Sequence, residues 1–190
     1  ACVAAKRHGV KVSCDLNYRK NLWSTEEAKR VMTPLMEYVD VCIANEEDAA
    51  DVFGIHAEKT NIQGGKLDMN GYISVARQLT ERFHFSKVAI TLRGSLSASV
   101  NEWSGMLYSD GKAAFSTRYT IQIVDRVGGG DSFAGAMIYA LANGYNDEDA
   151  VNFAAAASCL KHTIEHDFNF VSVEEVKTLA GGNASGRVQR

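Results

Sequence analysis

Short β-branched segments alternate along this chain with helical segments, and this alternation limits its fold more than any other feature. The strand-like segments are residues 10–15, 39–44 and 87–92. The helical segments that lie between them are residues 24–38, 46–53 and 72–83. Strands that alternate with helices predict a mostly parallel sheet with helices on both faces, so the expected fold class is α/β.

Local signals support these elements. Ser24 and Glu27 have the spacing of a capping box, in which each side chain bonds to the other residue's backbone amide. Pro34, the chain's only proline, predicts a kink within the helix expected over residues 24–38. In parallel sheets, ligands bind at the carboxyl ends of the strands. The residues expected along that edge are 17–19, 45–48 and 93–97.

The second half of the chain has a different pattern. Residues 98–120 predict antiparallel strands, with tight turns at residues 103–105 and 109–111. Helical patterns then return at residues 132–143, 147–163 and 173–179. We therefore expect an antiparallel segment toward the C-terminal end of the sheet, followed by helices.

Both ends of the chain and one internal stretch depart from this regular pattern. Residues 1–9 resemble the last turns of a helix closed by a glycine, so we expect further sequence upstream. Residues 54–70 are polar and contain a Gly-Gly pair, which predicts a loop. Residues 181–190 are expected to form a flexible tail.

Composition and charge narrow the class of protein. A formal net charge of −3 gives no basic surface of the kind that binds nucleic acid. No apolar run approaches the roughly 18 residues of a membrane helix. Four cysteines without a CxxC pair predict reduced, buried thiols and a cytoplasmic protein. They are Cys2, Cys14, Cys42 and Cys159.

Three successive glycines, Gly128, Gly129 and Gly130, lead directly into a helical pattern. Without side chains, their backbone amides can converge on one point, and the amino end of a helix adds partial positive charge. This combination predicts an anion site suited to phosphate. Asp131 follows the glycines, either as the helix N-cap or as a group with a chemical role.

The spacing excludes the common nucleotide-binding loops. No Lys follows the glycines as in a Walker loop, and no strand precedes a G-x-G-x-x-G pattern here. A carboxylate and a phosphate repel each other, so a carboxylate placed beside a phosphate site needs a reason to be there. The interpretation we favour is that it takes a proton from a hydroxyl that attacks the phosphate. Such proton removal accelerates a reaction by a factor of roughly 10²–10⁴.

The segment Val124-Asp125-Arg126-Val127-Gly128-Gly129-Gly130-Asp131-Ser132-Phe133 resembles the C-terminal signature of ribokinase-like (PfkB-type) sugar kinases, commonly D-T-x-G-A-G-D-x-F. Arg126 stands where Thr is usual and Gly129 where Ala is usual. Together with Asp15-Leu16-Asn17-Tyr18-Arg19, this pattern resembles the 2-keto-3-deoxygluconate kinase branch. Further matches follow in order as far as about residue 179, so a ribokinase-like fold is expected.

The resemblance implies roles for the matching residues. Asp131 would deprotonate the substrate hydroxyl, and Gly128–Gly130 would neutralise charge on the transferred phosphoryl group. Arg19 would pair with the carboxylate of a sugar acid, because a guanidinium grips a carboxylate with two bonds. Asp167 would contact substrate hydroxyls. Without the family, Arg19 would be interpreted as part of a surface salt bridge and Asp167 as a loop cap.

The resemblance also implies ATP and Mg²⁺ as cofactors. The residues expected at the nucleotide are Asn17, Arg93, Gly94, Ser95, Gly128, Gly130, Asn152, Ala155 and Ala156. Asn45 and Asp48 resemble the family's N-x-x-E motif, which organises magnesium, although the shorter Asp favours contact through water. Without the family resemblance, residues 46–48 would be interpreted as acidic residues in the first turn of a helix. Ala155 and Ala156 would be interpreted simply as good helix formers.

The resemblance implies ATP-dependent phosphorylation of a sugar acid, with 2-keto-3-deoxygluconate as the leading substrate. The alternatives are a kinase for a neutral sugar such as fructose and a nucleotide-binding fragment without turnover. The second alternative arises because residues 1–180 match the catalytic portion but not the family's N-terminal lid and sugar-binding part. A homo-oligomer agrees with the family's dimers. A zinc site at His162 and His166 is a weaker alternative.

Overall fold

The computed structural model describes residues 1–57 and 69–182. Most of the expected loop over residues 54–70, and the expected tail beyond residue 182, lie outside the described residues. The chain divides into two compact units. Unit 1 comprises Ala1–Leu92 and Met106–Ala114, and unit 2 comprises Arg93–Gly105 and Phe115–Arg190.

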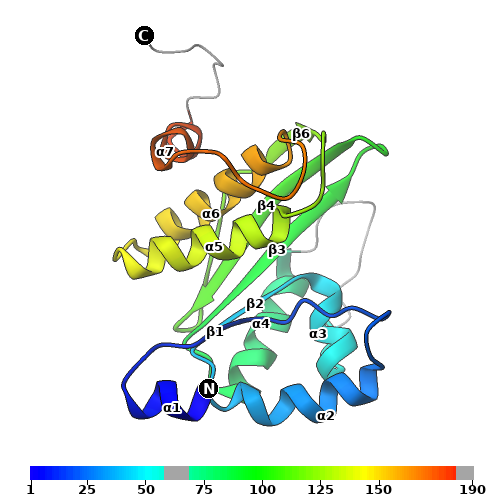
Figure 1. Cartoon of the computed structure of the whole chain (residues 1–190), viewed down its shortest axis with the longest axis vertical. Helices are drawn as coiled ribbons and strands as arrows, with labels where there is room; N and C mark the ends of the chain where they lie inside the picture. Colours follow the sequence, from blue (N-terminus) through cyan, green and yellow to red (C-terminus); the bar gives the residue numbers. More distant parts are fainter. Residues whose placement is uncertain (58–68, 183–190) are drawn as a thin grey trace. The chain divides into compact units, whose positions relative to one another are not determined.

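Unit 1 contains the parallel part of the sheet. Strand β1 pairs in parallel with β2, and β2 pairs in parallel with β3, with Cys14 opposite Cys42 and Cys42 opposite Val88. The bounds are β1 Ser13–Asp15, β2 Val41–Ala44 and β3 Lys87–Ser95. The helices of this unit are α1 Cys2–Arg7, α2 Thr25–Met36, α3 Glu46–Phe53 and α4 Met69–Phe83 (Figure 1). This alternation confirms the pattern predicted from the sequence.

The core of unit 1 forms around the apolar residues of β2 and of the first half of β3. Cys42, Val88 and Ile90 are fully buried, as sheets covered by helices require. Burial raises the pKa of the Cys42 thiol well above its ordinary value. All four cysteines are free thiols, as predicted, but Cys2 and Cys14 are only partly buried.

The antiparallel strands β4 and β5 are divided between the two units, whereas β6 and three helices lie in unit 2. The bounds are β4 Val100–Ser109, β5 Lys112–Phe115, β6 Tyr119–Gln122, α5 Gly129–Ala142, α6 Asp147–Lys161 and α7 Val173–Ala180. The strand order is β1-β2-β3-β4-β5, and β6 pairs with β4 in antiparallel register, with Asn101 opposite Ile121. Helices α5 and α6 lie alongside each other in this unit (Figure 1). None of the described helices is both long and apolar enough to span a bilayer.

Two local predictions are wrong in part. Residues 103–105 lie inside β4 and do not form a turn, whereas the turn at residues 109–111 is confirmed by positive φ angles of 49° and 76° at Asp110 and Gly111. Only half of the predicted capping box forms. Ser24 accepts from the Glu27 amide at 3.2 Å, whereas the Glu27 carboxylate lies 3.6 Å from Arg30.

Gly105 lies in β4 because a distant residue, Phe133, occupies the space that a side chain would need. A Cβ at this position would lie 2.7 Å from Cε2 of Phe133 and 3.4 Å from Cγ2 of Val151. Phe133, on α5, is fully buried. The missing side chain therefore makes room for the ring by which α5 packs against the strand.

We predict that Gly105→Ala destabilises unit 2 by about 1–3 kcal/mol, because the added methyl overpacks the Phe133 ring. Gly135→Ala is the matched control, since a Cβ there meets nothing within 4 Å and alanine favours a helix interior by up to about 1 kcal/mol. Urea unfolding of both variants measures the difference. Equal stability of the two variants would contradict the packing argument.

Candidate active site

The glycine triplet forms the start of α5. Gly128 is the N-cap and has a left-handed backbone, with φ 76° and ψ 0°, which glycine adopts at little cost. The helix begins at Gly129, three residues earlier than the sequence pattern predicts. Asp131 is therefore the third residue of the helix, and the interpretation of Asp131 as the N-cap is wrong.

The first amides of α5 are available to an anion. The first helical hydrogen bond runs from the Ser132 amide to the Gly128 carbonyl at 2.8 Å, and the Gly129 amide makes a 3.3 Å bond to Arg126. Within residues 1–57 and 69–182, the amides of Gly130 and Asp131 have no hydrogen-bond acceptor. Unsatisfied amides at a helix N-terminus favour negative charge.

The side chain of Asp131 is not used to hold the fold. It is exposed, and its carboxylate makes no hydrogen bond or ion pair with the part of the chain that the structure describes. This carboxylate is therefore available to a molecule bound at the start of α5.

The end of α6 lies directly beneath Gly128 and Gly129. A Cβ on Gly128 would overlap the Asp167 carbonyl oxygen and lie 3.3 Å from Cε of Lys161. A Cβ on Gly129 would lie 2.5 Å from Cε1 of His162. Gly130 differs from both, because a Cβ there would meet nothing within 4 Å. Close packing from below explains the first two glycines, and the third faces open space.

Hydrogen bonds fix this contact. The Ser158 hydroxyl donates to the Gly129 carbonyl at 2.7 Å, and both residues are buried. Nδ1 of His162 lies 2.7 Å from the Ser158 carbonyl, so Nδ1 carries the proton. Burial lowers the pKa of His162, whose ring packs 4.6 Å from the Trp103 ring. The end of α6 is thus a fixed base for the start of α5.

The weaker zinc hypothesis has no support in the described residues. His162 is buried against Trp103, whereas His166 is exposed with a left-handed backbone of φ 65°. Across residues 1–57 and 69–182, no three His, Cys, Asp or Glu side chains gather as a metal site would require.

Asp125 is a site residue that the sequence reasoning missed. Its carboxylate accepts from the Val127 amide and from the His166 amide, both at 2.9 Å. The bond from Val127, with the other amide bonds, lowers the pKa of Asp125. An Asp two residues before a backbone amide in a glycine-rich turn is a recognisable turn signal. The partner 41 residues away is not visible in the sequence.

The other predicted nucleotide residues in unit 2 lie on regular elements. Arg93, Gly94 and Ser95 are the last residues of β3 rather than a loop after it. A Cβ on Gly94 would lie 2.9 Å from Oε2 of Glu102, so this glycine makes room for a neighbouring strand. Asn152 accepts from the Thr117 amide at 2.8 Å and donates to the Glu148 carbonyl at 2.9 Å.

Ala155 and Ala156 are fully buried on α6, so their side chains are not exposed to a bound ring in this structure. Their role at adenine stays a prediction. Asp167 is exposed six residues beyond the end of α6, and its main chain, not its carboxylate, is the part packed against Gly128.

In unit 1, Asn45 and Asp48 cap α3 reciprocally. Asn45 accepts from the Glu47 and Asp48 amides at 2.8 Å, and Asp48 accepts from the Asn45 amide at 3.1 Å and the Tyr18 amide at 3.0 Å. Asp48 is 4% exposed, and burial raises its pKa. These oxygens are held by backbone amides, so direct coordination of magnesium does not fit them.

Asp48 also positions the segment after β1. The bond from the Tyr18 amide holds this loop near the start of α3, and Asn17 adopts φ 37°. Arg19 is exposed and donates to the Tyr18 carbonyl at 2.9 Å. No carboxylate among the described residues forms an ion pair with Arg19, so the surface salt bridge has no support there.

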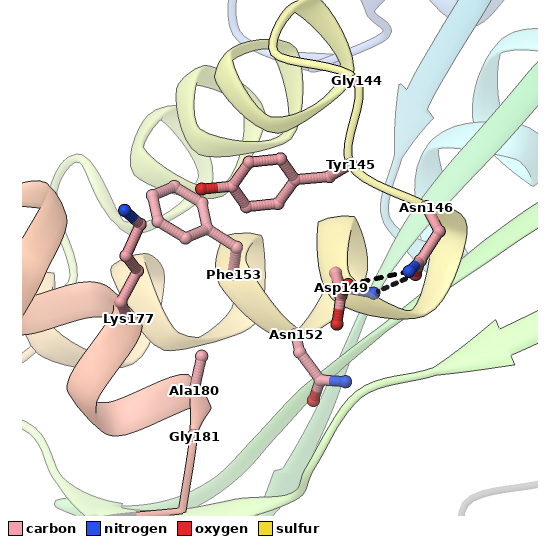
Figure 2. A pocket seen from close by; sticks show the side chains of 9 residues that line it. All are labelled: Gly144, Tyr145, Asn146, Asp149, Asn152, Phe153, Lys177, Ala180 and Gly181. Carbon is pink, nitrogen blue, oxygen red and sulfur yellow. Dashed lines mark hydrogen bonds between the residues drawn. The ribbon is translucent and has the colours of Figure 1, made fainter.

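One pocket in unit 2 lies away from the glycine turn. It has a volume of about 600 Å³ and is lined by Gly144, Tyr145, Asn146, Asp149, Asn152, Phe153, Lys177, Ala180 and Gly181 (Figure 2). It adjoins the C-terminal end of α5. At a rise of 1.5 Å per residue, the 14 residues of α5 place this end about 20 Å from the glycine turn at the start of the helix. A smaller groove of about 260 Å³ begins at Ser132, next to Asp131.

Comparison with protein-family models gives a single description for most of the chain. The model "pfkB family carbohydrate kinase" matches residues 1–165. The chain belongs to the pfkB family of carbohydrate kinases.

Individual pfkB relatives agree with this assignment. The crystal structure of 2-dehydro-3-deoxygluconokinase from Thermotoga maritima has 52% identity and a TM-score of 0.87, covering 96% of this chain and 53% of its own. A 2-dehydro-3-deoxygalactonokinase of Haloferax volcanii is 32% identical over 95% of this chain and 50% of its own length. Ribokinase from Thermotoga maritima has a TM-score of 0.63 at 21% identity, covering 95% of this chain and 52% of its own, which confirms the ribokinase-like fold. The chain spans about half the length of these relatives.

We predict that Gly128→Ala and Gly129→Ala each lower the free energy of unfolding by about 1–3 kcal/mol, through backbone strain at the first position and overpacking against His162 at the second. Gly130→Ala should be neutral or stabilising by up to about 1 kcal/mol. Urea denaturation of the three variants provides the measurement. A loss at Gly130 as large as at Gly129 would contradict this account of the turn.

Proposed function

We propose that this chain carries the phosphoryl-transfer centre of an ATP-dependent kinase for a sugar acid, with 2-keto-3-deoxygluconate as the substrate and its 6-phosphate as the product. The observation that carries the proposal is the start of α5, where two amides and a carboxylate lie together without partners among the described residues. Such a site attracts a phosphoryl group while keeping a proton acceptor next to it.

The chemistry then divides between backbone and side chain. Bound ATP supplies the phosphoryl group. The amides of Gly130 and Asp131, with the partial positive charge of α5, neutralise charge on that group as it is transferred. The Asp131 carboxylate accepts the proton of the attacking hydroxyl, which makes the oxygen a better nucleophile.

Arg19 supports an acidic substrate. Its guanidinium is exposed, donates from Nη1 to the Tyr18 carbonyl, and forms no ion pair with the described residues. A permanent charge with a planar fork suits a carboxylate. The named activities of the relatives from Thermotoga maritima and Haloferax volcanii, a dehydro-deoxy-glucono and a dehydro-deoxy-galactono kinase, agree with this class. A neutral sugar such as fructose remains the alternative substrate.

Magnesium is expected with ATP, but Asn45 and Asp48 do not offer free oxygens for it. Their role is therefore to hold the loop around Tyr18 and the start of α3, and no step is assigned to a metal at these residues. The cytoplasmic location, expected from the cysteines, and a homo-oligomer, expected from the family's dimers, remain predictions.

We predict that Asp131→Asn lowers kcat by about 10²–10⁴, because the amide cannot take the proton. The thermal midpoint should fall by no more than about 4 °C, since Asp131 makes no hydrogen bond with the described residues and loses only its interaction with the helix dipole. ADP release with ATP, magnesium and 2-keto-3-deoxygluconate measures the rate. Asp110→Asn, in the turn between β4 and β5, is the matched control. Full phosphorylation by Asp131→Asn would refute the assigned base.

For substrate class, we predict that Arg19→Ala raises KM for 2-keto-3-deoxygluconate by about 10- to 100-fold, the value of a charged hydrogen bond, and changes KM for fructose little. Arg30→Ala, on α2, is the control. Steady-state kinetics with both sugars provides the test. Faster turnover of fructose by the native chain would favour the neutral-sugar kinase, and nucleotide binding without turnover would favour a binding fragment.

A further inference from the structure

One fully buried cation in unit 2 has no part in the proposed chemistry. Lys161, the last residue of α6, is 0% exposed, and it is the only Lys or Arg among the buried residues that the structure describes. Its ammonium donates to the Ile164 carbonyl at 3.1 Å. A buried charge is costly, so a lysine in this position needs an explanation.

The location of Lys161 supplies that explanation. Its Cε lies 3.3 Å from the position of a Cβ on Gly128, where the Asp167 carbonyl also approaches. The ammonium is thus held between the turn after α6 and the turn before α5. Its charge lowers the pKa of Asp125, the carboxylate that ties the same two turns together, which agrees with the geometry.

We propose that Lys161 is a positioning residue for the glycine turn: its ammonium holds the carbonyl-lined turn at residues 162–167 against Gly128 and adds positive charge beneath the phosphate-binding amides. This inference rests on the proposed function of the turn. The ammonium does not contact the reacting atoms, and it acts through the placement of the Gly128–Gly130 backbone.

A purely structural role makes a different prediction. Apolar side chains of similar volume often replace buried ionic groups without loss of stability. If Lys161 only fills space, methionine should serve equally well in every respect. If Lys161 positions the turn and supplies charge, methionine should preserve the fold and weaken the binding of a polyanion.

The experiment compares the native chain with Lys161→Met, using Lys177→Met as the matched control, because Lys177 is an exposed lysine of α7 paired with Glu174. Inorganic tripolyphosphate and adenosine are the two probes, measured by calorimetry. We expect Lys161→Met to lose at least tenfold in tripolyphosphate affinity with no change for adenosine. The control variant should bind both probes as the native chain does.

A second variant covers the case in which methionine does not fold. Lys161→Ala leaves space for a small cation, so ethylammonium should restore tripolyphosphate binding at least in part, and tetramethylammonium should not. Native affinity in Lys161→Met, or no recovery of Lys161→Ala with ethylammonium, would overturn the inference. Failure of the native chain to bind tripolyphosphate would instead refute the proposed phosphate site, on which the inference depends.

Discussion

The first turn of α5 rests on the last turn of α6, and the geometry of the candidate site depends on this contact. The His162 ring and the Lys161 stem fill the space where side chains on Gly129 and Gly128 would lie. The Ser158 hydroxyl holds the Gly129 carbonyl. These groups support the turn from below, and the amides of Gly130 and Asp131 have no acceptor within residues 1–57 and 69–182. The proposed anion site therefore depends on how two helices pack.

Much of the fold could be predicted because its signals are local. The β-branched segments of unit 1 and their intervening helices follow directly from periodicity, and α3 has the bounds that the sequence indicates. The errors come from residues with distant partners. Gly105 resembles a turn glycine, yet it lies in a strand because Phe133 needs the space. Asp131 resembles an N-cap, yet the left-handed backbone of Gly128 starts the helix earlier.

The candidate site divides in the same way. The groups proposed to react belong to one contiguous motif, so the sequence alone is enough to propose Asp131 and the three glycines. Its supporting groups come from α6 and resemble an ordinary helix end, so only the folded chain identifies them. Residues inferred from the family alone differ in their exposure to a ligand. Arg19 is exposed, whereas Ala155 and Ala156 are buried.

Asp125 has a mechanical consequence. One carboxylate holds the amide of Val127 in its own turn and the amide of His166 in a turn 41 residues away. The two turns therefore share one hydrogen-bond acceptor, and neither can shift alone without breaking a charge-assisted hydrogen bond. Any adjustment of the glycine loop around a ligand would carry the neighbouring segment with it as one rigid body.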